Sequence, residues 1–472
     1  MTDTTAQELD RYLDQMREPG EFDSQGFFTV AGLRAVGKLA QFLLEKESDW
    51  ILKFVQCACA ADCPNLRINQ TRVATQFHFT LPYSVSLRDF ERSLIQTENT
   101  SSQPGLEDLT TALRAVGLGQ KRDWVAKLNT PSEETLISCS EGKVSADLTK
   151  TGSAHGPGTL VTVGVSYPRG QSGKVAGLIR FGEAVQSEHE TLRDRARCCP
   201  IPLYLDGNRL DDLTTDTLKL GLENKSFLAI SGAPDSGPQA LRVPGGVARE
   251  EGFQLEDRFA DSAPFYTSQV EPNGRVTSLQ CWYFNFTTSR ENLHKAGFFF
   301  QPVPTPSRVF LVRRGVVVGC RYFGLRHAIS VDIYLRADTL KSDLTGLKVE
   351  VTDTEMEIAG DELLRSGEFL ERLTGVLQHH TPRPLKQQML LYGSLGALGL
   401  MAPIFALKAV AGTVTTLLLA NSARNHRKVV TECIRQLDDF RAWLSTRRKT
   451  SSSGDPSPPA HLPSEAPNTS EK

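Results

Sequence analysis

The residues with the strongest chemical character in this sequence lie close together, in the stretch WILKFVQCACAADC at 50–63. It contains Cys57, Cys59 and Cys63 in a C-x-C-x3-C pattern, which could suggest a metal site. On a helix, however, Cys59 and Cys63 share a face, whereas Cys57 and Cys59 diverge by about 200°. No second cysteine pair or histidine cluster completes a zinc-type ligand set. We therefore predict no metal site and interpret these thiols as small buried hydrophobes.

A helix must position these residues. We expect it over 50–61, with Asp49 as its N-cap and Pro64 ending it. Its apolar residues recur at helical spacing: Trp50, Ile51, Phe54, Val55 and Ala58. Lys53 and Gln56 are three residues apart and share one face of this helix. A lysine in such surroundings is expected to extend toward water or to pair with a carboxylate.

The overall composition sets wider limits. The chain has 472 residues, enough for two or three domains, with 39% hydrophobic and 23% charged residues. A net charge of -2 provides no global field that would draw the protein to nucleic acid, so nucleic acid is not a predicted partner. The nine cysteines are an odd number, and the polar, acidic start carries no apolar signal segment. Free thiols in the cytoplasm are therefore expected.

Hydrophobic periodicity divides the rest of the chain into helices and strands. Helical patterns are expected at 29–47, 86–95, 106–118, 187–199 and 366–380, and strands are expected at 65–81, 123–150, 159–167 and over much of 228–340. In the second strand region, Trp282, Phe284 and Phe286 alternate and predict the inward face of a sheet.

Residues 389–422 form the most apolar stretch, in which Lys408 is the one charged residue. Residues 389–407 alone satisfy the length of a bilayer span, and basic residues flank both ends. Against insertion, Pro403 and Lys408 lie within the segment, and a central lysine costs about 2.5–3.5 kcal/mol. The alternative is a helical hairpin that packs on the soluble domains or forms a dimer interface. We expect membrane association as a re-entrant or two-pass hairpin, with both ends in the cytoplasm.

The order of these patterns resembles the GHKL ATPase superfamily, which includes gyrase, the 90-kDa heat-shock chaperones, histidine kinases and mismatch-repair ATPases. There, a helix reading roughly E-L-hydrophobic-x-N-A-x-D-A-G-A leads into a strand. Residues 53–63 lie over that pattern, and NLRI at 65–68 fills the strand. Gly158-Thr159 with LVTV resembles the glycine-threonine strand that closes the domain.

The following part of the chain resembles the middle domain of the chaperones. ETLRDRARCCPIPLYLDGNRL at 190–210 is similar to a charged helix that runs into a strand. RVFLVRRGVVVGC at 308–320 and ADTLKSDLTGLKV at 337–349 are similar to an arginine-glycine strand and a final turn of that domain. The resemblance covers about residues 30–370.

The departures from the family pattern concern the nucleotide ligands. Cys57 stands at the position of the asparagine that holds Mg²⁺, and Lys53, or Gln56 in another register, stands at the acidic position. Mg²⁺ prefers hard oxygen ligands to sulfur, and lysine cannot replace a carboxylate base. The D-x-G-x-G motif that should follow is missing from NQTRVATQFHFTLPYS.

Two glycine-rich segments could still cradle a phosphate through backbone N–H groups. They supply Gly117 and Gly119 in the first segment and Gly156, Gly158 and Thr159 in the second. Together with Lys53, Gln56 and Cys57, these are the positions of a degenerate nucleotide site. No cofactor is expected, although ATP stays an alternative.

The expected fold class is α+β, a GHKL (Bergerat-type) α/β sandwich followed by a mixed α/β middle domain, a hydrophobic helical segment and a disordered tail. The expected parts are an N-terminal helix or linker (1–28), the degenerate ATPase-like domain (29–185), the middle domain (186–380), the hydrophobic segment (389–422), an amphipathic helix (423–447) and the tail (448–472).

The sequence predicts a chaperone-like pseudo-ATPase that contacts protein clients or partners, with a homodimer left open. The alternatives are an active ATP-binding chaperone and a membrane-tethered scaffold without nucleotide.

Overall fold

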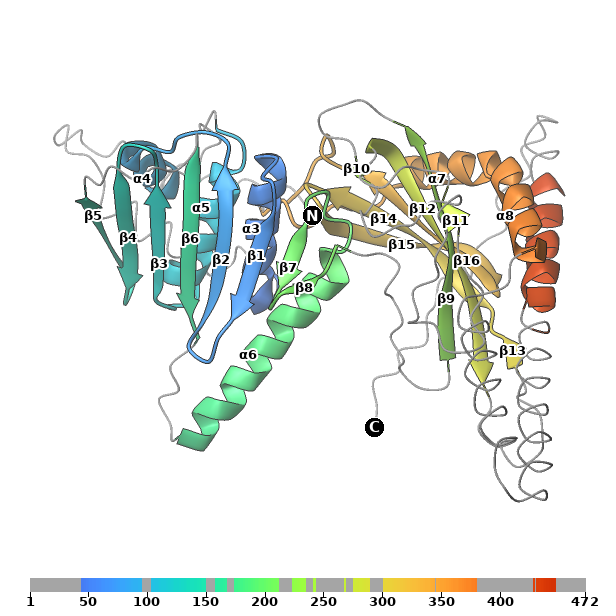
Figure 1. Ribbon diagram of the computed structural model, residues 1–472, viewed down its shortest axis with the longest axis horizontal. Helices are drawn as coiled ribbons and strands as arrows, with labels where there is room; N and C mark the ends of the chain where they lie inside the picture. Colours follow the sequence, from blue (N-terminus) through green and yellow to red (C-terminus); the bar gives the residue numbers. More distant parts are fainter. Residues whose placement is uncertain are drawn as a thin grey trace, which may run out of the picture.

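A computed structural model gives the structure of the protein. It describes residues 44–95, 103–149, 158–167, 174–211, 223–234, 241–242, 267–268, 275–288, 300–343, 345–379, 428 and 430–446. Two eight-stranded sheets, each covered by helices, lie next to one another along the longest axis (Figure 1).

The helices fall into three groups. The first sheet is accompanied by η1 (Glu47–Asp49), α3 (Trp50–Ala60), α4 (Leu87–Ile95), α5 (Leu106–Arg114), the π-helical turn η2 (Ala115–Gly119) and α6 (Lys174–Arg195). The second sheet is followed by α7 (Asp353–Arg365) and α8 (Gly367–His379). A last helix covers residues 430–446.

The first sheet has the strand order β5-β4-β3-β6-β2-β1-β7-β8. The strands are β1 (Leu66–Gln70), β2 (Ala74–Leu81), β3 (Trp124–Asn129), β4 (Glu134–Ser140), β5 (Lys143–Thr149), β6 (Thr159–Ser166), β7 (Leu203–Leu205) and β8 (Asn208–Arg209). All neighbours are antiparallel except β1 and β7, which run parallel.

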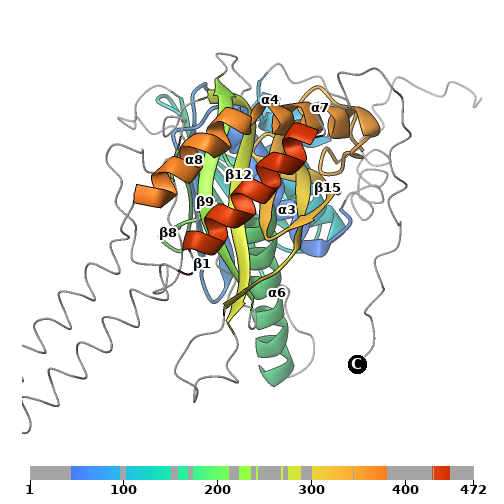
Figure 2. The ribbon, with the colours of Figure 1, turned by 90° about the vertical axis from the view of Figure 1, so that its right-hand side faces the viewer.

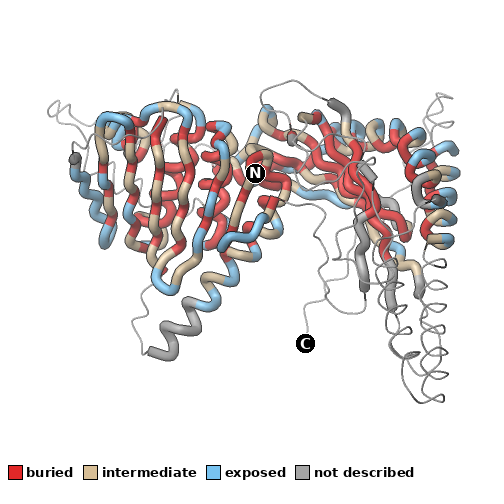
Figure 3. The backbone as a smooth tube through the Cα atoms, viewed as in Figure 1, coloured by how far each residue is buried: buried red, intermediate tan, exposed pale blue. Residues whose placement is uncertain are grey.

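Strict alternation of residue types makes this sheet two-sided. Phe77, Phe79 and Leu81 of β2 are buried, while the residues between them are partly exposed. Since side chains alternate across a strand, one face packs against helices and the other meets solvent. The alternation is visible along the strands of the first sheet (Figure 3).

The second sheet has the order β11-β9-β12-β16-β14-β15, with β10 and β13 also paired to β12. Its strands are β9 (Glu223–Pro234), β10 (Leu241–Arg242), β11 (Thr267–Ser268), β12 (Arg275–Thr288), β13 (Phe300–Pro302), β14 (Thr305–Arg313), β15 (Val316–His327) and β16 (Ile329–Arg336).

One face of this second sheet is covered by helices. Trp282 of β12 contacts Phe369 of α8 and Phe440 of the last helix, with ring centroids 6.1 and 5.5 Å apart. The last helix and α8 lie side by side across the sheet (Figure 2). The buried residues of the last helix are Cys433, Leu437, Phe440 and Leu444, which form the apolar stripe of an amphipathic helix.

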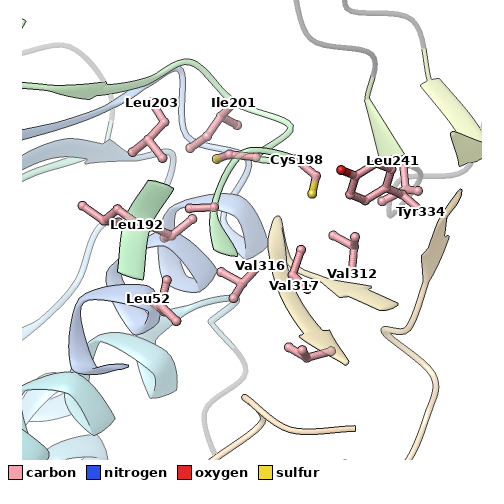
Figure 4. Packing of buried hydrophobic residues seen from close by; sticks show 14 of the residues in the cluster. Leu52, Leu192, Cys198, Ile201, Leu203, Leu241, Val312, Val316, Val317 and Tyr334 are labelled. Atoms are coloured by element: carbon pink, nitrogen blue, oxygen red, sulfur yellow. The ribbon is translucent and has the colours of Figure 1, made fainter. Parts of the chain in front are cut away.

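The two halves share one hydrophobic core. Leu52 of α3, Leu192 of α6 and Val316 of β15 gather at the junction of the sheets (Figure 4). All three are fully buried. The end of α6 and the β14–β15 turn therefore bring the second sheet against the helix that carries Lys53.

Several details differ from the sequence-based expectations. Asp49 stands at the N-cap position of α3, but its side chain makes no capping hydrogen bond, and its carboxylate accepts one from Arg195 instead. The expected helix over 187–199 begins earlier, at Lys174, and ends at Arg195. It therefore crosses the expected boundary between 185 and 186, and β7 and β8 beyond it complete the first sheet.

The strand β12 also differs from a strand with one inward face. Trp282 and Phe284 are buried as predicted, but Cys281 and Tyr283 on the opposite face are buried as well. The strand lies in the interior of the sheet, between β9 and β16. Residues 281–284 are buried on both faces of this strand.

Part of the expected organisation lies outside the described residues. This applies to the N-terminal segment (1–28), most of the helix expected at 29–47, the hydrophobic segment (389–422) and the tail (448–472). Among the helices that the structure does describe, none combines the length and apolar character that a bilayer span requires.

Candidate functional site

Lys53 lies at the centre of a buried polar cluster between α3 and α5. Its Nζ donates to Oδ1 of Asp108, at 2.8 Å, and to Oε1 of Gln56, also at 2.8 Å. The side chains of Lys53 and Asp108 are only 5% and 7% exposed. The expectation that Lys53 would pair with a carboxylate is therefore confirmed, and the partner is the third residue of α5.

The second sheet contributes the remaining members of this cluster. Arg314, in the turn between β14 and β15, donates through Nη1 to Oδ2 of Asp108. The amide of Gln56 donates to the carbonyl of Gly346 at 3.0 Å and, at 3.5 Å, to that of Arg313. We call Lys53, Gln56, Asp108 and Arg314 the junction cluster, because its members come from both halves.

The charges of the junction cluster are unequal. One carboxylate faces two cations, and each carboxylate oxygen is bound by one of them. Burial by itself works to raise the pKa of Asp108, but the Lys53 ammonium and the Arg314 guanidinium outweigh it and hold that pKa below its ordinary value. Asp108 therefore stays ionised at neutral pH.

Cys57 lies beside this cluster, at the place where α3 meets the start of α5. It is fully buried, and burial raises the pKa of its thiol well above the ordinary value. Gly105, with φ of 84°, precedes α5, and a Cβ at that position would lie 2.4 Å from the Cys57 carbonyl oxygen. The backbones of the two helices are thus in direct contact, and Cys57 remains a neutral thiol in the core.

The glycine positions of the predicted nucleotide site lie elsewhere on the first half. Gly117 and Gly119 belong to η2, and a Cβ on Gly117 would lie 2.4 Å from Nε1 of Trp124 on β3. Gly158 packs against the carbonyl of Leu81, while Gly156 lies outside the described residues. The structure therefore brings together Lys53, Gln56 and Cys57, with Gly117 packed against β3.

Thr159 is the first residue of β6, and its hydroxyl bonds two backbone groups of the loop that follows β2. Its Oγ1 accepts from the backbone N–H of Val85 at 2.9 Å and donates to the carbonyl of Tyr83 at 2.9 Å. The Tyr83 hydroxyl in turn donates to the carbonyl of Pro104, just before α5. Thr159 thus stabilises the loop that leads from β2 toward α4.

A second set of contacts holds the two halves together near the junction cluster. Arg195, at the end of α6, donates to Oδ1 of Asp49 at 3.0 Å, to the carbonyl of Val317 at 2.9 Å and to that of Leu347 at 2.6 Å. One guanidinium therefore joins η1 to two segments of the second half. Its fork of donors suits such a multiple contact.

Two cysteines meet on the other side of α3. The Sγ atoms of Cys59 and Cys199 are 3.4 Å apart, and burial raises the pKa of Cys59 well above its ordinary value. Gly315, with φ of 77°, closes over them, since a Cβ there would lie 2.7 Å from the Cys59 Sγ. In the part of the chain that the structure describes, no group of three His, Cys, Asp or Glu side chains could hold a metal ion.

The chemistry of the junction cluster is that of a filled anion site. Two cations, Lys53 and Arg314, bind the same carboxylate, and such a pair of cations could also bind a phosphate group. The place of the anion is taken by the carboxylate of Asp108, a residue of the chain itself. The junction cluster therefore binds the first half of the molecule to the second.

Sequence reasoning missed Asp108 and Arg314. Asp108 falls within the helix expected at 106–118, and an acidic residue in the first turn of a helix is ordinary because it suits the helix dipole. A signal was present in its neighbours, because Leu106, Leu109 and Leu113 are apolar and Asp108 lies among buried residues of α5. Arg314 was noted only within an arginine-glycine strand, with no partner.

Comparisons with known proteins give only distant likenesses. No family model and no curated protein matches the sequence. The chain is similar to the B-subunit of DNA gyrase from Myxococcus xanthus, at 7% identity and a TM-score of 0.37, over 71% of this chain and 96% of that one.

It is also similar to the ATPase region of Saccharomyces cerevisiae topoisomerase II. The form bound to ICRF-187 gives 8% identity and a TM-score of 0.33, over 66% of this chain and 78% of that one. Another structure of this region gives 9% identity and a TM-score of 0.31, over 66% and 81%. At TM-scores this low, the likenesses carry no weight for function.

Proposed function

We propose that this protein is a GHKL-like, chaperone-type pseudo-ATPase, in which an internal ion cluster closes the nucleotide site and the molecule acts through protein contacts. The observation that carries the proposal is the buried carboxylate of Asp108, bound at once by Lys53 of the first half and Arg314 of the second.

The arrangement of the first half supports the GHKL-like part of the proposal. The helix α3, which carries the degenerate motif, leads directly into β1. Gly158-Thr159 begins β6, which pairs with β2 and β3 in the middle of the sheet. The elements that carry the resemblance in sequence are therefore neighbours in one sandwich of sheet and helices.

The state of the ligand positions supports the loss of ATP hydrolysis. Cys57 is a neutral thiol at the position where the family uses an asparagine oxygen, and Mg²⁺ binds sulfur poorly. The Oε1 of Gln56 already accepts a hydrogen bond from Lys53, and its amide nitrogen donates to the carbonyl of Gly346. Neither side chain offers a free oxygen to a metal-bound triphosphate.

Electrostatics support the same conclusion for the phosphate end. Lys53 and Arg314 could attract a phosphate, but both are bound to Asp108. A triphosphate that entered would have to displace this carboxylate, and the displaced charge would remain buried beside it. Burying like charges together is strongly unfavourable.

Calorimetry with a non-hydrolysable ATP analogue, with and without Mg²⁺, tests the closed site. We expect no binding by the natural protein. Binding with millimolar or tighter affinity that Mg²⁺ strengthens would refute the proposal, and so would ATP turnover that disappears on substitution of Lys53 or Cys57.

The variant Asp108→Asn tests the role of the carboxylate. It keeps the size of the side chain but leaves Lys53 and Arg314 without their counter-charge, so we expect weak binding of inorganic triphosphate that the natural protein lacks. Glu91→Gln, on the exposed side of α4, removes one negative charge elsewhere and is the matched control. Equal binding by both variants would count against the cluster as the closing device.

The chaperone role is tested separately, by light scattering from a heat-unfolded client protein. We expect the full chain to reduce aggregation equally with and without ATP, because no nucleotide step is involved. Unchanged aggregation would remove the chaperone role and leave the closed site untouched.

A further inference from the structure

The strand β5 forms one end of the first sheet, and no other described strand than β4 pairs with it. Residues 143–147 are all exposed, and β5 lies at the far end of the sheet from the junction (Figures 1 and 3). In the described ranges, β4 is the one strand that pairs with β5. Edge strands of this kind offer a row of backbone donors and acceptors to another strand.

The turn before β5 fixes which backbone groups face that edge. Glu141 and Gly142 have φ of 51° and 77°, and they join Ser140 to its partner Lys143. This is the geometry of a two-residue type I′ hairpin, in which the flanking residues exchange hydrogen bonds. Since the bonding direction alternates, Val144 and Ala146 direct their N–H and C=O groups toward the free edge.

The side chains of β5 alternate in chemistry as well as in direction. Lys143, Ser145 and Asp147 lie on the solvent face of the sheet. Val144 and Ala146 lie opposite the buried residues Cys139 and Ile137, on the face that the helices cover. Val144 is 41% exposed because the helices do not extend over this last strand.

We propose that β5 pairs antiparallel with β5 of a second copy of this chain, about a two-fold axis at Ser145. Lys143 of each copy then lies opposite Asp147 of the other, and Val144 lies opposite Ala146. The two charges of the strand are thereby neutralised in two identical pairs. The backbone groups of Val144 and Ala146 meet in hydrogen-bonded pairs, as the turn geometry requires.

The charges select this register over its nearest rival. A two-fold axis at Ala146 would also satisfy the backbone alternation. It would place Lys143 opposite Thr149 and Asp147 opposite Ser145, so that neither charge has an opposite partner. Opposite charges directly across two strands contribute about 0.2–1 kcal/mol per pair. The self-complementary spacing of Lys143 and Asp147 therefore favours pairing with a second copy over pairing with an unrelated strand.

Sedimentation equilibrium of the full chain over a wide concentration range tests the proposal. We expect a dimer whose dissociation constant rises about tenfold or more in Lys143→Glu and in Asp147→Lys, because each substitution places like charges together twice. The double variant restores both pairs in reversed order, so we expect it to return to within about threefold of the natural protein. Arg72→Glu, in the exposed turn between β1 and β2, makes the same charge change elsewhere and should leave the dimer unchanged.

A second variant tests the backbone contact. Ala146→Pro removes an N–H that faces the free edge and leaves the β4–β5 ladder intact, so we expect the dimer to be lost while the far-ultraviolet circular dichroism is kept. A monomeric natural protein would overturn the proposal. An oligomer that none of these substitutions weakens would also overturn it and would place the association on another surface.

Discussion

Two buried ion pairs of the first half differ in what they join. Arg122 and Glu188 are 3.0 Å apart, with 5% and 2% of their side chains exposed, and all their partners belong to the first half. Lys53 and Asp108 are as deeply buried, but Asp108 also binds Arg314 from the second half. Two equally buried ion pairs can therefore stabilise one half or connect both halves. Which of these a pair does depends on the half from which its partners come.

The surroundings of the two pairs sharpen this difference. Glu188 has one cation and also accepts hydrogen bonds from Thr75 and Gln70, at 2.7 and 3.2 Å, while Arg122 lies over the Trp50 ring. These neutral partners fix α6 to the sheet. Asp108 instead has two cations, one of which arrives with a turn of the other half. The first pair holds a helix to the sheet within one half of the molecule. The second pair, with Arg314, forms the joint between the two halves.

The largest effect is expected from Glu188→Ala. It leaves the Arg122 guanidinium buried without its counter-charge, and breaking such a pair costs about 3–5 kcal/mol. Urea unfolding followed by tryptophan fluorescence measures this loss. Glu190→Ala, on an exposed part of the same helix, is the control and should change stability by less than about 0.5 kcal/mol. Equal losses of unfolding free energy in both variants would show that the buried Arg122–Glu188 pair contributes no more to stability than an exposed residue of α6.

A somewhat smaller effect is expected from Asp108→Ala. Lys53 loses its carboxylate in the interior, whereas Arg314, 37% exposed, can return to water, so we expect a loss of about 2–3 kcal/mol. Hydrogen exchange should rise at 313–317 and 345–349 and stay low in β2, β3 and β6. Uniformly faster exchange in both halves would contradict a specific role of Asp108 in holding the halves together.

The pH dependence of the joint follows from the lowered pKa of Asp108. The unfolded carboxyl has a pKa of about 3.9, so the contribution of Asp108 is complete above that pH and is lost as pH falls through its lower folded pKa. Exchange at 345–349 should therefore rise only below about pH 4. In Asp108→Asn this acid-induced rise should disappear. A rise near neutral pH would point to another group.

The smallest effect is expected at the surface of the same boundary. Lys348 and Glu45 also join the two halves, at 3.4 Å, but their side chains are 68% and 71% exposed. Such pairs contribute little, so Lys348→Ala should change the free energy of unfolding by less than about 0.5 kcal/mol. A loss as large as that of Asp108→Ala would mean that contact between the halves, rather than burial, sets the energy.

The sequence predicts the elements that depend on local patterns. The helix over 50–61 corresponds to α3, and the alternating residues of 65–81 form the β1–β2 hairpin. The buried state of Cys57 and the pairing of Lys53 also follow from residue type and spacing. Each of these depends on periodicity or on the cost of burying a charge alone.

The parts that the sequence did not predict depend on residues far apart in the chain. Nothing near Lys53 indicates that its partner is Asp108, which is 55 residues away, or that Arg314 completes the set. Asp49 illustrates the same limit, because its local position suggested a helix cap, whereas Arg195 binds it in the fold. Long-range ion pairs override local preferences when burial makes them stronger.

The order of synthesis sets the order in which the members of the junction cluster can meet. Asp108 and Arg314 are 206 residues apart, and every strand of the first sheet, through β8, is made before Arg314. Domains generally fold as units while the chain emerges from the ribosome. Lys53 and Asp108 can therefore pair before the β14–β15 turn brings Arg314 to the second carboxylate oxygen.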